Sequence, residues 1–269
     1  MSEITSILAK ELIIVEKKID AALKLLDEGN TIPFIARYRK EVTGELDEEQ
    51  IRNISERAQY LRNLAERRSE IILSITTQEK MTPELEKAIN STTKLQDLED
   101  LYLPYRPKKR TRAQIARGKG LAPLADLIIA QEKPAETLEQ LAAAYLNEEQ
   151  GLLNIDDVWA GASDIVAETV AERADIRELV RQSIRQNAEL VSELCVDETV
   201  GQDFLMYKEY AEPVKQLPPH RILALNRGEK KGCLKLHLNL PSESTLAKIN
   251  QKLQIKANGI FTENYTAAA

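Results

Sequence analysis

A dense run of basic side chains is the feature of this sequence that most directly suggests a chemistry. Between residues 106 and 120 the chain holds seven arginines and lysines and no acidic residue. Such side chains neutralise backbone phosphates, and a guanidinium can donate two hydrogen bonds to one phosphate group. Tyr102 and Tyr105 stand just before the run and could stack on bases. We therefore predict a nucleic-acid contact in this segment. Its candidate residues are Arg106, Lys108, Lys109, Arg110, Arg112, Arg117 and Lys119.

The distribution of charge makes this run stand out further. The formal net charge of the chain is −6, so the residues outside 106–120 together carry −13. A polyanion would be attracted to the basic segment and repelled by the rest of the surface. Composition alone leaves an alternative open, in which the run is simply solvated or pairs with acidic side chains of the same chain.

A second basic cluster consists of Arg37, Arg39 and Lys40. It lies on a short helix predicted over 34–42, because Pro33 is tolerated in a first helical turn. The helical period is expected to turn Ile35 and Tyr38 toward the core and the three cations toward solvent. These cations are further candidates for a phosphate contact.

The residue patterns of common catalytic sites do not occur in the sequence. The Gly-Lys-Gly at 118–120 lacks the preceding glycine and the following hydroxyl of a phosphate-binding loop. His220 and His237 are the two histidines, and no Gly-x-Ser-x-Gly nucleophile motif is present. Clustered acids stand near predicted helix ends, where they complement the helix dipole. We expect no enzymatic activity, no catalytic residues, no metal site, no cofactor and no small-molecule substrate.

Hydrophobic spacing predicts a mainly α protein. An apolar stripe at intervals of three and four predicts one helix over 3–28, and Asp47 with Gln50 predicts a capping box that opens a long helix. Arg68 falls in the inner stripe of that long helix and is expected to extend its head group to the surface. Two prolines at 103–107 break the helical pattern. The basic segment is therefore expected to begin on an extended connection and to continue onto the helix after it.

The pattern changes after about residue 198, where glycine and proline become frequent. We predict a helical domain over 1–198, a linker or boundary over 199–218 and a second region over 219–269. Residues 188–195 are expected to continue the helices. Alternating leucines over 233–240 predict a strand, whose partner we expect near 251–262 or beyond residue 269. The predicted fold is thus a multi-helix bundle with a small C-terminal segment that contains at least one β-strand.

The spacing of the cysteines and the hydropathy of the sequence indicate the cellular compartment of the protein. Cys195 and Cys233 form no Cys-x-x-Cys pair, and no apolar run approaches the length that spans a bilayer. The first residues lack the basic and then apolar order of a signal peptide. We expect a cytoplasmic protein without a membrane partner.

Three stretches carry a resemblance to a known family. They are TIPFIARYRKEVTG at 31–44, LEDLYLPYR at 98–106 and PHRILALNRG at 219–228, with KKRT at 108–111. In this order they closely resemble the N-terminal region of the Tex family of bacterial transcription accessory proteins, up to about residue 240. The resemblance implies a helical domain with a helix-turn-helix-like element. In complete members it implies a following RNase H-like domain, helix-hairpin-helix motifs and a C-terminal OB-fold RNA-binding domain to which much of the nucleic-acid binding is attributed. The 269 residues are expected to correspond to about the first third.

Two functional hypotheses follow. In the first, the chain is a non-catalytic, nucleic-acid-associated module that contacts the phosphates of RNA or DNA through the basic segment without reading bases. In the second, it is a helical protein-interaction scaffold that docks on the transcription machinery or on the later domains of the family.

Overall fold

The computed structural model describes residues 3–107, 110–131, 136–256 and 261. The chain divides into two compact units, Met1–Tyr105 and Arg106–Ala269. Most of the described residues are helical, and a small antiparallel sheet lies near the C-terminal end. The predicted mainly α fold with a strand-containing C-terminal segment is confirmed. The helix-turn-helix-like element stays a prediction.

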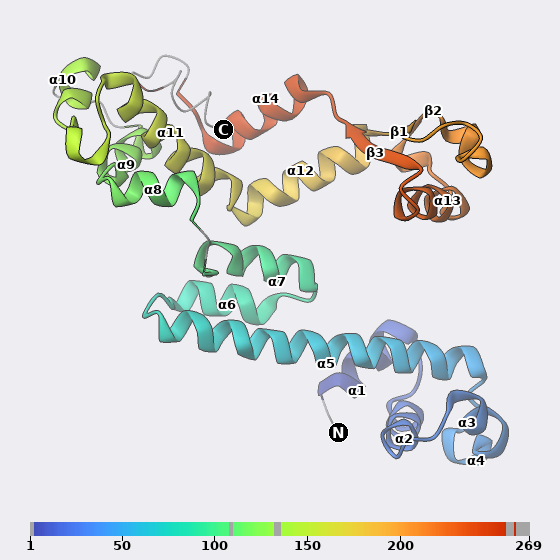
Figure 1. Cartoon of the computed structure of the whole chain (residues 1–269). Helices are drawn as coiled ribbons and strands as arrows, with labels where there is room; N and C mark the ends of the chain where they lie inside the picture. Colours follow the sequence, from blue (N-terminus) through green and yellow to red (C-terminus); the bar gives the residue numbers. More distant parts are fainter. Residues whose placement is uncertain (1–2, 108–109, 132–135, 257–260, 262–269) are drawn as a thin grey trace. The chain divides into compact units, whose positions relative to one another are not determined.

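The first unit is built around one long helix, α5. The other helices pack along it, with α1, α2 and α3 on its N-terminal half and α6 and α7 on its C-terminal half (Figure 1). The elements are α1 (Glu3–Leu12), α2 (Glu16–Asp27), α3 (Ile32–Tyr38), α4 (Lys40–Thr43), α5 (Glu48–Thr77), α6 (Pro83–Ser91), α7 (Leu95–Tyr102) and the 3-10 helix η1 (Leu103–Tyr105).

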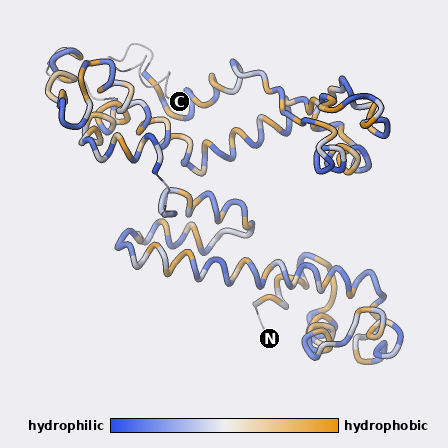
Figure 2. The backbone as a smooth tube through the Cα atoms, in the orientation of Figure 1, coloured by the Kyte–Doolittle hydropathy of each residue, from blue (hydrophilic) through white to orange (hydrophobic). Residues whose placement is uncertain are grey.

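The predicted capping box at the start of α5 is confirmed. The Asp47 carboxylate accepts a hydrogen bond from the Gln50 amide at 2.7 Å, and the Gln50 side chain accepts one from the Asp47 amide at 3.1 Å. Hydrophobic and hydrophilic residues alternate along α5 at helical spacing (Figure 2), and Ile51 and Ile54 begin its buried stripe. This cap and stripe fix where α5 starts and which side faces its neighbours.

We expect Asp47→Ala to lower the free energy of unfolding by about 1 kcal/mol, because the Gln50 amide loses the carboxylate that accepts its hydrogen bond. Asp47→Asn keeps an acceptor and should stay close to the parent chain. Urea denaturation followed by circular dichroism measures both. Equal losses in the two variants would show that the cap is not the cause.

The single helix predicted over 3–28 is wrong, because the chain breaks between α1 and α2. Ile13 has a left-handed backbone, with φ 57°, and its side chain is 92% exposed. The break lets α1 and α2 contact each other and lets both contact α5. Leu8 of α1 and Ile19 of α2 are both fully buried in the core that the two helices share with α5.

The second unit has a helical part and a small sheet. Helix α11 contacts α8, α9, α10 and α12 around one hydrophobic core, while α12 and α14 lie side by side and lead to the sheet (Figure 1). The elements are α8 (Arg112–Gly118), α9 (Ala122–Ala130), α10 (Leu138–Ala143), η2 (Glu148–Gln150), α11 (Ile155–Ala171), α12 (Ala174–Asn187), β1 (Glu189–Leu194), η3 (Gln202–Tyr207), β2 (Glu209–Pro213), η4 (Val214–Gln216), α13 (Pro219–Lys230), β3 (Leu234–Asn239) and α14 (Ser242–Leu253).

The sheet corrects two expectations. Residues 188–195 were predicted to be helical, but they contain β1, the central strand in the antiparallel order β2-β1-β3. The strand predicted over 233–240 is confirmed as β3, but its partner is β1 rather than a segment near 251–262 or beyond residue 269. Residues 188–195 fit helix and strand patterns about equally. This segment forms a strand because β2 and β3 form backbone hydrogen bonds with the two edges of β1. The buried Ser192 hydroxyl also holds β1 in place, since it donates to the Tyr207 carbonyl oxygen at 2.7 Å.

The domain bounds predicted from composition stay a prediction. The division into compact units falls between Tyr105 and Arg106, inside the range predicted as one helical domain. The stretch predicted as a linker or boundary, 199–218, contains η3, β2 and η4 and buries Phe204 and Tyr207.

Candidate nucleic-acid interface

Helix α8 is held firmly against α11. The Thr111 hydroxyl caps α8 by accepting from the Gln114 amide at 3.1 Å. Ala116 is buried against α11, where Gly161 permits a close approach. A Cβ atom added to Gly161 would lie 2.4 Å from a methyl carbon of Leu121 and 3.4 Å from the Cβ of Ala116. The small residues on both helices therefore let α8 pack closely on α11. This close packing fixes the position of the exposed side of α8 within the unit.

The predicted basic segment is largely exposed. Arg106, Arg110 and Arg117 are exposed, and within the described ranges no ion pair joins any of them to an acid. Arg117 donates to the Thr169 hydroxyl at 3.3 Å. Lys108 and Lys109 lie outside the described residues.

The two remaining cations of the segment have neighbours. Arg112 is 86% exposed at its side chain and forms an ion pair with Asp164 at 3.3 Å. The ammonium of Lys119, which is half-buried, donates to the Gly151 carbonyl oxygen at 3.3 Å. We call Arg106, Arg110, Arg112, Arg117 and Lys119 the α8 basic edge.

Two arginines of α5, Arg57 and Arg62, differ from the unpaired arginines of the α8 basic edge because acidic side chains neutralise them. Arg57 binds Glu11 through two hydrogen bonds of 2.6 and 2.7 Å, and Arg62 binds Asp27 through two of 2.7 Å. The arginine hydrogen bonds hold the pKa of each carboxyl, Glu11 and Asp27, below its ordinary value. Arg57 and Arg62 are thus neutralised within the first unit, whereas Arg106, Arg110 and Arg117 have no acid partner within the described ranges.

The second predicted cluster lies in the first unit, on α3 and α4. Arg37, Arg39 and Lys40 are exposed, and none forms an ion pair with an acid in the described part of the chain. The prediction that Ile35 faces the core is confirmed, but the same prediction for Tyr38 is wrong, because its side chain lies on the surface. Phe34 and Tyr38, spaced by four residues, share one side of α3. That spacing predicts that the two rings share one side of the helix, but the tertiary structure decided that this side is exposed.

A hollow of about 240 Å³ lies beside the α8 basic edge. Arg112 and Lys119 border it, and so do Asp157 and Asp164, over a floor that includes Leu121. Two acids facing two cations leave no excess positive charge there. The side of the α8 basic edge that faces away from this hollow is therefore the part suited to a phosphate.

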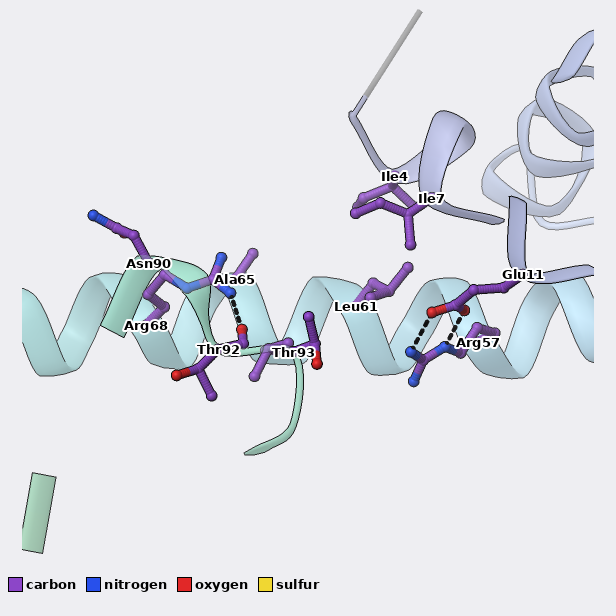
Figure 3. A pocket seen from close by; sticks show the side chains of 11 residues that line it. Ile4, Ile7, Glu11, Arg57, Leu61, Ala65, Arg68, Asn90, Thr92 and Thr93 are labelled. Carbon is purple, nitrogen blue, oxygen red and sulfur yellow. Dashed lines mark hydrogen bonds and ion pairs between the residues drawn. The ribbon is translucent and has the colours of Figure 1, made fainter. Parts of the chain in front are cut away.

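A cavity of about 200 Å³ in the first unit lies between α1, α5 and the segment after α6 (Figure 3). The paired Glu11 and Arg57 border one end, and Arg68 and Thr92 border the other. Arg68 was expected to extend to the surface, but its guanidinium donates to the Thr92 carbonyl oxygen at 2.7 Å. Its Nε is buried without a hydrogen-bond partner among the residues described. This arginine therefore ties α5 to the α6–α7 connection.

Among the residues that the structure describes, no group of three or more histidine, cysteine, aspartate or glutamate side chains is placed to hold a metal ion. No helix in the described part of the chain combines the length and the apolar character needed to cross a bilayer.

Comparisons with known proteins agree with the resemblance of the three sequence stretches. A family model described as Tex-like protein N-terminal domain matches residues 2–76, and one described as Tex central region-like matches residues 133–268. Protein YhgF of Escherichia coli (strain K12) is 47% identical over 234 residues, which cover 87% of this chain and 30% of that protein. Transcriptional accessory protein Tex of Neisseria gonorrhoeae is 43% identical over 246 residues, which cover 90% of this chain and 32% of that protein.

A more distant relative carries a different description. S1 RNA-binding domain-containing protein 1 of Homo sapiens is 31% identical over 226 residues, which cover 81% of this chain and 22% of that protein. The chain spans about a third of the length of the bacterial relatives it matches. Because the two family models together cover most of its residues, the chain belongs to the Tex family of transcription accessory proteins.

Proposed function

We propose that the chain is a non-catalytic module that binds the backbone of RNA or DNA, without sequence preference, through the α8 basic edge. One observation carries the proposal: Arg106, Arg110 and Arg117 are exposed and have no acid partner among the described residues, while the residues outside 106–120 carry a net charge of −13. The names of the relatives support it, since one is a transcriptional accessory protein and another contains an S1 RNA-binding domain. We extend the proposal to the cytoplasm, because transcription in bacteria occurs there.

The chemistry of the edge suits phosphates. Arg106, Arg110 and Arg117 each offer a planar set of donors that fits a phosphate group. The Arg112–Asp164 pair is exposed and therefore weak, about 0–1 kcal/mol, so a phosphate can replace the carboxylate at little cost. Contacts of this kind fix position on the strand and carry no information about base sequence.

A titration tests the proposal. Fluorescence anisotropy would follow labelled RNA and DNA oligonucleotides of about 16 nucleotides, single-stranded and duplex, across a range of salt concentrations. Four phosphate contacts on a single strand predict a slope of about −2.8 for log affinity against log salt, or about a 50-fold loss for a fourfold rise in salt. Absence of binding at low salt, or binding that ignores salt, would reject the proposal.

The alternative is a scaffold that docks on the transcription machinery or on later Tex domains. It draws support from apolar side chains left exposed on the small sheet part, including Met206 and Leu223. Under this alternative, oligonucleotides would not bind at low salt, while purified RNA polymerase would bind the immobilised chain.

A further inference from the structure

Tyr38 presents an aromatic ring to solvent. Of the phenylalanine, tyrosine and tryptophan side chains that the structure describes, it is the exposed one, at 66%. The half-buried ring of Phe34 lies beside it on α3, with 5.4 Å between ring centroids and 43° between ring planes. A large exposed ring next to a second ring gives a surface that favours contact with another flat, apolar face.

Other tyrosines of the chain have internal roles. The Tyr60 hydroxyl accepts from the Leu95 amide at 2.9 Å, and the Tyr102 hydroxyl lies 3.0 Å from that of Ser74. Within the described residues, the Tyr38 hydroxyl has no hydrogen bond. Tyr38 therefore does little for the fold, and its ring remains available.

Three cations flank Tyr38 in the sequence. Arg37, Arg39 and Lys40 are exposed and form no ion pairs in the described part of the chain. The Arg39 guanidinium lies 5.2 Å from the Phe34 ring centroid and donates to the Tyr38 carbonyl oxygen at 3.3 Å. Glu41 is the one acid of the segment 37–41, which keeps a net charge of +2. The surface thus combines a free ring with an excess of positive charge.

The elements beneath hold this surface in place. Ile35 is fully buried in the core shared with α5, and Ala36 beside it is also buried. The Thr43 hydroxyl, buried behind the surface, donates to the carbonyl oxygens of Arg39 and Lys40 at 3.3 and 3.2 Å. The ring and the cations are therefore mounted on a packed helix pair and are preorganised for a ligand.

We propose that Tyr38 stacks on an unpaired base of a single-stranded nucleic acid while Arg37, Arg39 and Lys40 neutralise its phosphates. This inference rests on the proposed function and adds a second contact, in the other unit, together with a preference for single strands. The preference follows because a duplex keeps its base faces stacked on each other, whereas a single strand can turn a base onto an exposed ring.

Variants of the full chain test the stacking contact by anisotropy. We expect Tyr38→Ala to lower affinity for a single-stranded oligonucleotide about 10-fold, with an unchanged salt slope and an unchanged affinity for duplex. Tyr38→Phe keeps the ring and should retain the parent affinity. Val42→Ala is the matched control, since it removes an exposed apolar side chain from α4 but no ring. An equal loss in Val42→Ala, or an equal loss for duplex, would overturn stacking.

A cross-link separates this inference from the proposed function. A single strand that carries 5-iodouridine should, on irradiation, form a cross-link that mass spectrometry maps to Tyr38. Loss of single-strand affinity in Tyr38→Ala with no effect of charge reversal on the α8 basic edge would sustain stacking and reject the α8 contact. If charge reversal on the α8 basic edge lowers affinity, while Tyr38→Ala does not and no cross-link forms at Tyr38, stacking would be overturned and the α8 contact would stand. No binding of any oligonucleotide by the parent chain would overturn both.

Discussion

Replacing Arg106, Arg110 and Arg117 together by glutamate is expected to lower the affinity of the chain for nucleic acid about 100-fold or more at low salt. Each arginine is exposed and lacks an acid partner within the described ranges, so each can release one counterion on binding a phosphate. Three lost contacts on a single strand should also make the salt slope shallower by about 2.1. Anisotropy titrations at several salt concentrations measure both effects.

The control for this variant changes the same charge elsewhere. Lys215, Lys230 and Lys235 are exposed in the same unit, on η4, α13 and β3, and form no ion pairs among the described residues. Their joint replacement by glutamate alters net charge equally but should leave the salt slope unchanged. If the two triple variants lose affinity equally, the attraction comes from net charge and the α8 basic edge is not the contact.

Phe204→Ala is expected to open the small sheet part of the second unit. Phe204 is 2% exposed and packs with Tyr207, Leu225 and Leu234 in a core of few residues. Removing a buried phenyl ring costs about 3–5 kcal/mol, much of the stability that so small a core can supply. Cys233 is buried in the same core and reports its opening. We expect Cys233 alkylation by N-ethylmaleimide to accelerate about 100-fold or more.

The chain supplies an internal standard and a matched control for this measurement. Cys195 is exposed, so its alkylation should proceed at the same rate in every variant. Met206 lies on η3 with Phe204 but is 75% exposed, and Met206→Ala should leave the Cys233 rate near that of the parent chain. Unchanged protection of Cys233 in Phe204→Ala would show that the sheet part does not depend on this ring.

Residues close in sequence determined many features of this chain. Asp47 with Gln50 identified the start of α5, and the alternation at 234–239 identified β3. The three family stretches and the basic segment were also visible from sequence, because a motif or a run of charge is a local property. The spacing of hydrophobic residues is local in the same way, because a period of two indicates a strand with one buried side and a period of about 3.6 indicates a helix with one buried side. The predicted role of the α8 basic edge stays a prediction.

Contacts between residues far apart in sequence decided the rest. Helices α1 and α2 separate at Ile13 because both pack on α5, and residues 189–194 form a strand because β2 and β3 pair with its two edges. Glu11 neutralises Arg57 across 46 residues, while Arg117 meets no acid within the described ranges. Tyr38 turned out to be exposed although its spacing fitted a buried position. Local spacing limits which side of an element can be buried, but pairing and ion neutralisation depend on which distant groups the folded chain brings within bonding distance.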